Sequence, residues 1–140
     1  TRLYTGLGGI SIMALGKIKA DTLEHSTAGS LDTSYVVNGS AKAYVGFTCV
    51  SSTAIHGSFN ISSLSDDGTG HTHVNYTNNM SNDDYSVGSA CGNTSAGVYN
   101  RGTCCNAYAT GSYEQFTFAS NSDGAVDLSQ VSSNTFGDIA

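Results

Sequence analysis

The chain has 140 residues, enough for one domain with a modest core, and charged residues make up only 11% of them. The formal net charge is −6 with five basic residues, which leaves no basic patch of the kind that nucleic-acid binding requires. No apolar run approaches the roughly 20 residues of a membrane-spanning helix, and the apolar segment 7–15 lacks the basic flank of a signal peptide, so membrane insertion is not expected.

Residues 1–40 are too poor in apolar side chains to bury a core of their own. Lys17–Leu23 alternates loosely and predicts a weak strand, 26–30 is typical of a turn, and Ser34–Val37 predicts a second short strand. We expect this segment to be an extended arm that packs on neighbouring chains or on a larger assembly.

Residues 41–140 carry turn residues roughly every 8–12 positions, the spacing of a β-sandwich or barrel. Residues 92–106 are rich in loop-forming residues and are expected to form a surface excursion. The sequence has no convincing amphipathic helix. It also has no Pro, a residue that prevents strand edges from pairing with other chains, so oligomerisation is one way to cover these edges. The expected strands cover residues 43–49, 54–64, 71–77, 85–91, 113–119, 126–131 and 135–139.

Alternation of side chains assigns faces within these strands. In Ala43–Cys49, the residues Val45, Phe47 and Cys49 share one face, and Phe116 and Phe118 share one face of a later strand. The side chains expected to point inward from the central strands are Ile55, Phe59, Ile61, Val74 and Tyr76.

The four cysteines do not have the density of a disulfide scaffold. Cys49 and Cys91 lie in apolar strand-like runs and are expected to be small buried hydrophobic residues. Cys104 and Cys105 are adjacent, so they cannot face the same side of a strand, and a strained vicinal disulfide between them is not favoured.

Asp66–Gly70 (DDGTG) stands between two strand-like runs and predicts a hairpin turn. The segments around it are Ala43–Phe47 (AYVGF), Ser58–Leu64 (SFNISSL) and Val74–Tyr76 (VNY). Together with residues 116–118 and 126–138, they resemble the C-terminal β domain of bacteriophage tail-fibre proteins, especially marine ones. The resemblance runs from about residue 32 to residue 140. This chain departs from the usual pattern with Tyr44 for Trp, Gly46 for Asn, and histidines at 71 and 73.

The resemblance implies a virion structural protein, assembled in the host cytoplasm and exposed on the extracellular particle. It further implies a homotrimeric fibre or knob that helps the particle to adsorb to a host cell. Such knobs bind surface glycans or outer-membrane proteins through exposed loops, and the N-terminal arm would join other tail or capsid proteins of the virion.

His71 and His73 are two apart on a predicted strand, so both imidazoles project from one face. Around the threefold axis of a trimer they could ring a metal ion that prefers nitrogen ligands. The other interpretation, which we favour, is a pair of exposed polar residues after a turn. No cofactor is otherwise expected.

Three residues of the loop-rich segment are candidates for receptor contact: Tyr99, Arg101 and Tyr108. Tyrosine combines a flat apolar face with a hydroxyl, and arginine adds a forked donor. The equal alternative is that the tyrosines pack the rim of the domain or a trimer interface.

Motifs for catalysis are missing from the sequence. It contains no GxSxG, HExxH or paired-acid signature, and Asp66–Gly68 lacks the third acid and closing Glu of a calcium loop. We therefore expect an all-β protein without enzymatic activity. Residues 41–140 would form a knob-like antiparallel β-sandwich, residues 1–40 an arm, and the whole a homotrimeric tail-fibre or tail-tip protein for host attachment. The alternative is a capsid decoration, head fibre or collar protein with a purely structural role.

Overall fold

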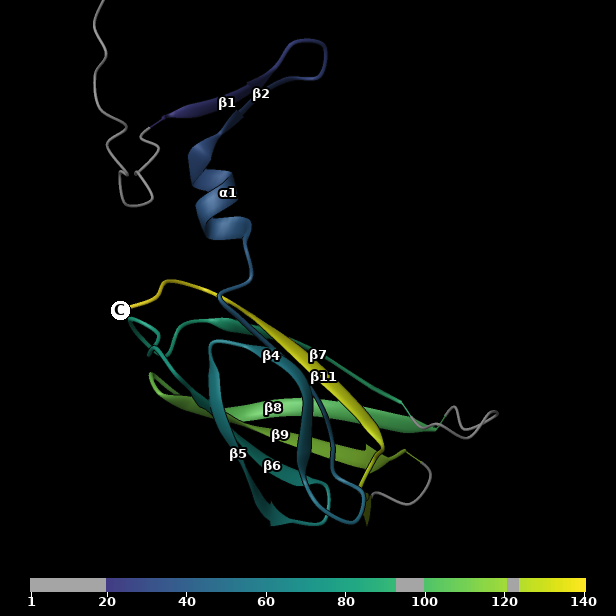
Figure 1. Cartoon of the computed structure of the whole chain (residues 1–140). Helices are drawn as coiled ribbons and strands as arrows, with labels where there is room; N and C mark the ends of the chain where they lie inside the picture. Colours follow the sequence, from purple (N-terminus) through teal and green to yellow (C-terminus); the bar gives the residue numbers. More distant parts are fainter. Residues whose placement is uncertain (1–19, 93–99, 121–123) are drawn as a thin grey trace, which may run out of the picture. The chain divides into compact units, whose positions relative to one another are not determined.

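The computed structural model describes residues 20–92, 100–120 and 124–140, which belong to two compact units, Thr1–Thr33 and Ser34–Ala140 (Figure 1). In the first unit, β1 (Thr22–His25) and β2 (Gly29–Asp32) form an antiparallel hairpin. Leu23 and Leu31 face each other across it and remain about half exposed, so the hairpin buries no core of its own. This agrees with the low apolar content of the segment.

A short helix, α1 (Thr33–Gly39), stands where the sequence predicted a strand at Ser34–Val37, so that prediction is wrong. The end of the helix is held by local hydrogen bonds: Ser40 N donates to Val36 O at 3.1 Å, and the Lys42 ammonium donates to Val37 O. These bonds satisfy the last carbonyls of the helix and outweigh the strand preference of two adjacent valines.

From Ala43 on, the described residues of the second unit form two antiparallel sheets (Figure 1). The four-stranded sheet has the order β4-β3-β11-β7, and the five-stranded sheet has the order β10-β9-β6-β5, with β8 also paired to β9. The bounds are β3 (Ala43–Thr48), β4 (Ala54–Phe59), β5 (Ile61–Gly68), β6 (His71–Tyr76), β7 (Ser86–Gly92), β8 (Arg101–Ala109), β9 (Ser112–Ala119), β10 (Gly124–Ala125) and β11 (Gln130–Phe136). The all-β prediction is confirmed.

A cluster of buried residues draws its members from both sheets. Strict alternation of buried and less buried residues runs along β6, β9 and β11, as expected for strands with one face inward. The predicted inward positions Val74 and Tyr76 are buried, and so are Val45, Phe47 and Cys49, which were predicted to share one face.

The core contains hydroxyl groups as well as apolar side chains, and they join the sheets. Tyr76 Oη and Thr135 Oγ1 are 3.0 Å apart, and the hydroxyls of Tyr113 and Ser133 also share a hydrogen bond. Each pair links the five-stranded sheet to the four-stranded one. Pairing satisfies the buried phenols, which would otherwise destabilise the core.

The chain passes from one sheet to the other at Asn60. Its φ is 56°, a left-handed conformation that asparagine tolerates better than most residues. The side chain is fixed on both sides: Asn60 Oδ1 accepts a hydrogen bond from Asn78 N at 2.7 Å, and Asn60 Nδ2 donates to Asn78 O at 3.1 Å. As a result, β4 and β5 form a single bent strand that is the edge of both sheets.

Two sequence expectations fail beside this corner. Ile55 and Phe59 were expected inside, yet they are 40% and 55% exposed. They lie on β4, an edge strand with a bulge opposite Gly46, and every residue of β4 is exposed. The ring of Phe59 stacks instead on Tyr44, also on the surface, with ring centroids 6.4 Å apart.

The expected surface excursion at 92–106 is also incorrect in its second half. Residues Arg101–Ala109 form the nine-residue strand β8, which pairs with β9 along most of its length. Small and polar residues hide its strand character in the sequence, because the partner strand rather than local preference stabilises it. Residues 93–99 of the expected loop lie outside the described residues.

The cysteines behave largely as predicted. Cys49 is buried and Cys91 is partly buried, and the described cysteines are all free thiols. Cys104 is exposed while its neighbour Cys105 is partly buried, as opposite faces of β8 require. Burial raises the pKa of the Cys49 and Cys105 thiols, so these two are poor nucleophiles.

Gly70 should be irreplaceable. Its φ is +64°, and an added Cβ would lie 2.4 Å from Thr117 O and 2.7 Å from Val126 N. We expect Gly70→Ala to lower the free energy of unfolding by about 2–4 kcal/mol, measured by urea denaturation. Gly57→Ala is the control, because no atom lies within 4 Å of its added Cβ, and its midpoint should stay unchanged. Equal midpoints for the two variants would contradict this account.

The buried tyrosines should make the fold sensitive to alkali. Burial raises the pKa of Tyr76 and Tyr113 well above the usual value near 10. Above about pH 10 the unfolded chain therefore loses protons that the folded chain keeps, and stability should fall by about 1.4 kcal/mol per pH unit for each tyrosine. Below pH 10 neither tyrosine contributes a pH dependence.

Urea denaturation between pH 7 and 11.5 measures this slope. Tyr76→Phe should make it shallower by about 1.4 kcal/mol per pH unit. Tyr35→Phe, a change at an exposed tyrosine of α1, should leave it unaltered. If Tyr76→Phe leaves the slope unchanged, burial of Tyr76 is not the cause of the alkaline loss of stability.

Candidate functional site

His71 and His73 lie together on the outward face of the five-stranded sheet. Both are on β6, where Thr72 and Val74 point into the core, so the two imidazoles share the opposite face as the sequence predicted. They are partly exposed, with 28% and 32% of their side-chain surface accessible.

Neighbouring strands bring two carboxylates to the same place. Glu114 of β9 is directly opposite His73 in the strand register. Asp67 lies in a register shift between Asp66 and Gly68 on β5, and such a bulge can turn a side chain toward a new direction. Ligand atoms of Asp67, His73 and Glu114 all lie within 4.8 Å of one another.

His71 lies close to two members of this cluster. Its Nε2 lies 3.3 Å from Glu114 Oε2 and 3.9 Å from Asp67 Oδ2, and His73 Nδ1 lies 3.5 Å from Asp67 Oδ2. The imidazole stacks on Phe116 with centroids 4.2 Å apart, which fixes the plane of the ring. Nε2 is buried and makes no hydrogen bond of good geometry with any described residue.

The sequence pattern does not indicate Asp67 and Glu114 as site residues. Asp67 belongs to a predicted turn, and Glu114 is a single acid in an aromatic strand. Alternation does place Glu114 on the same face as Phe116. Only the pairing of β6 with β9 shows that this face also carries the histidines, and register between distant strands has no local signal.

Two of the three residues predicted for receptor contact, Arg101 and Tyr108, lie on strand β8. Tyr108 packs edge-on against Tyr85, at 5.1 Å between centroids, and lies over Tyr113 at 6.5 Å, which matches the packing alternative. Arg101 donates hydrogen bonds from one guanidinium nitrogen to the carbonyl and side-chain oxygens of Asn100. Tyr99 lies outside the described residues.

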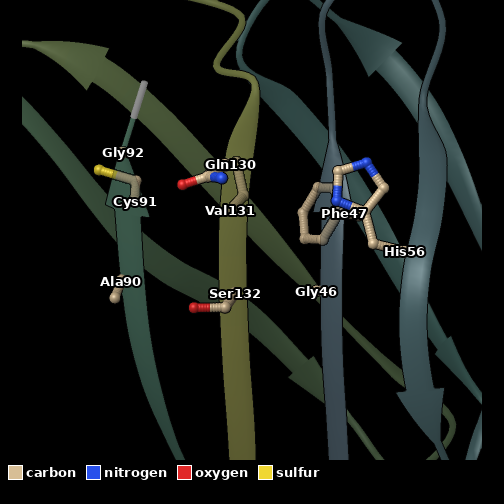
Figure 2. A pocket seen from close by; sticks show the side chains of 9 residues that line it. All are labelled: Gly46, Phe47, His56, Ala90, Cys91, Gly92, Gln130, Val131 and Ser132. Atoms are coloured by element: carbon tan, nitrogen blue, oxygen red, sulfur yellow. The ribbon is translucent and has the colours of Figure 1, made fainter. Parts of the chain in front are cut away.

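A second candidate surface is the outward face of the four-stranded sheet. It carries an open pocket of about 380 Å³, and Figure 2 shows its lining on neighbouring strands. Glycine, alanine and serine form much of this pocket, and His56 and Gln130 supply polar groups. The lining residues are Gly46, Phe47, His56, Ala90, Cys91, Gly92, Gln130, Val131 and Ser132.

The exposed aromatic pair lies on the same face as this pocket. Tyr44 and Phe59 are paired in the register, two residues along from the Gly46–Gly57 pair. Tyr44 is 50% exposed, and Phe59 slightly more. We refer to Tyr44, Phe59 and the pocket together as the outer aromatic face.

The packing of Tyr108 can be tested by its effect on stability. We expect Tyr108→Ala to lower the free energy of unfolding by about 2 kcal/mol, because contacts with Tyr85 and Tyr113 are lost. Tyr35→Ala, at a tyrosine that is 69% exposed, should change it by less than about 0.5 kcal/mol. If Tyr108→Ala behaves like this control, Tyr108 is not part of the core.

Within the described ranges, no helix is long and apolar enough to span a membrane. Comparison of the chain with protein-family models, with curated proteins and with solved structures gives no match.

Proposed function

We propose that this chain is a bacteriophage tail-fibre or tail-tip protein that attaches the particle to a host surface by non-enzymatic binding. The observation that carries the proposal is where the tail-fibre-like segments lie. Val45, Phe47, Val74 and Tyr76 from these segments are buried core residues, and Asn60 is the corner between the sheets. The likeness thus involves residues that determine a fold, which is the kind of similarity that a shared domain would leave.

The proposed architecture is a knob-like β-sandwich. Hydroxyl pairs such as Tyr76–Thr135 link residues of opposite sheets, and one core cluster draws residues from both. Two antiparallel sheets that share a core and alternate inward and outward residues are the arrangement of a sandwich.

A homotrimer would protect the bent edge strand. Residues 54–68 form the edge of both sheets, contain no Pro, and carry acids only at Asp66 and Asp67. Such an edge is open to pairing with other chains unless it is covered. Copies of the chain around a threefold axis, with the N-terminal segment joined to other virion proteins, would provide that cover. The half-exposed Leu23 and Leu31 of the hairpin suit such a junction.

We assign host recognition to the outer aromatic face and a surface glycan as its occupant. Exposed Tyr and Phe rings offer flat apolar surfaces on which the apolar faces of sugar rings can stack. His56, Gln130 and Ser132 add uncharged or weakly basic polar groups beside a floor of small residues. An open pocket with a few polar groups suits a ligand rich in hydroxyls.

The alternative is a capsid decoration, head fibre or collar protein, in which the same fold only covers other protein surfaces. The exposed hairpin leucines favour neither role, since both need an attachment point. Antibody labelling of intact particles separates the two: labelling of the tail supports attachment, and labelling of the capsid shell supports the structural role.

Binding of the purified full chain to an array of bacterial surface glycans tests the recognition site. We expect Tyr44→Ala combined with Phe59→Ala to weaken binding at least tenfold, because the stacking surface is removed. Tyr35→Ala, at an exposed tyrosine on α1, should leave binding unchanged. Both variants should unfold at the wild-type urea concentration, since none of these side chains is buried.

Full binding by the double variant would show that recognition lies on another surface. If the unaltered protein binds neither the glycans nor bacterial outer-membrane vesicles, the attachment function itself is wrong.

A further inference from the structure

We propose that Asp67, His71, His73 and Glu114 form a binding site for one divalent transition-metal ion within each chain. The site is independent of the proposed attachment function. It also differs from a metal on a trimer axis, because ligands from a single chain suffice.

Two of the three distances known among these side chains are close to those of a tetrahedral ligand set. Nitrogen and oxygen ligands bind Zn²⁺ at about 2.0–2.1 Å, which places neighbouring ligand atoms about 3.3–3.4 Å apart. The measured separations are 3.3 Å for His71 Nε2 to Glu114 Oε2 and 3.5 Å for His73 Nδ1 to Asp67 Oδ2. The third, His71 Nε2 to Asp67 Oδ2, is 3.9 Å and would close by a small side-chain movement.

The Nε2 atom of His71, which has no hydrogen-bond partner in the described part of the chain, gives separate support for a metal site. Nε2 is shielded from solvent but has no well-formed hydrogen bond among the described residues, although two carboxylates are near. Buried polar atoms without partners are uncommon and destabilising. A metal ion between this nitrogen and the carboxylates would satisfy it.

Charge favours a divalent ion. Among the described residues, Asp67 and Glu114 form ion-pair contacts with the two histidines and not with Lys or Arg. Two carboxylates and two neutral imidazoles carry a charge of −2, which one divalent ion neutralises. Imidazole with carboxylate suits Zn²⁺ and related transition metals, whereas Ca²⁺ and Mg²⁺ prefer oxygen ligands alone.

The ligands come from three adjacent strands of one sheet: β5, β6 and β9. A bound ion would therefore fasten the tip of the β5–β6 hairpin to β9. The ring of Phe116 stacks on His71 and holds it in place before an ion binds. Less conformational entropy of the His71 side chain is therefore lost on binding.

Titration of the chelator-treated full chain with Zn²⁺, followed by equilibrium dialysis, measures the stoichiometry. We expect one ion per chain, whereas an ion on a threefold axis gives one per three chains. Saturation at one hundred times the dissociation constant should also raise the melting temperature by about 10 °C, and EDTA should reverse the rise. Co²⁺ should give the intense visible absorption of a tetrahedral site.

Variants identify the ligands. Asp67→Asn, His73→Ala and Glu114→Gln should each weaken Zn²⁺ binding at least tenfold. His56→Ala, at an exposed histidine of the other sheet, should leave binding unchanged. Binding that depends on His71 and His73 but survives both carboxylate changes would overturn the proposal in favour of a simple surface His pair. A ratio of one ion per three chains, or no binding, would also overturn it.

Discussion

The left-handed turn at Asn60 is the constraint on which the second unit depends. Because the backbone changes direction there, one strand ends the four-stranded sheet and begins the edge of the five-stranded sheet. Three hydrogen bonds between the Asn60 side chain and Asn78 hold the corner against the chain that leaves β6. The corner thereby ties the edges of the two sheets together and positions the hairpin that carries three of the four candidate metal ligands.

The core between the sheets is shaped by the chain's unusual composition. Tyrosine side chains fill part of the core. Because the chain is rich in small polar residues, Thr135 and Ser133 of the opposite sheet are there to pair with the phenols. A hydroxyl pair is directional in a way that aliphatic contacts are not, so it also fixes how the sheets lie over each other. The phenols that fix the alignment of the sheets would destabilise this core if they were left unpaired.

Local patterns in the sequence predicted the strands whose inward and outward side chains alternate clearly, such as Ala43–Thr48 and His71–Tyr76. They failed where a partner strand or a local cap decides the structure. β8 is a strand because β9 pairs with it, and α1 is a helix because Ser40 and Lys42 satisfy its end. For the candidate metal site, the spacing of His71 and His73 was informative, whereas Asp67 and Glu114 required a bulge and a long-range register.

The alternation of β6 divides its residues into two sets with different freedom to evolve. Thr72, Val74 and Tyr76 are bound into the core, so exchanging them disturbs the packing between the sheets. The side chains of His71 and His73 instead contact residues that face outward, namely Asp67, Glu114 and Phe116. A lineage with this scaffold can therefore change the two histidines of the candidate metal site, while the architecture that supports them stays intact.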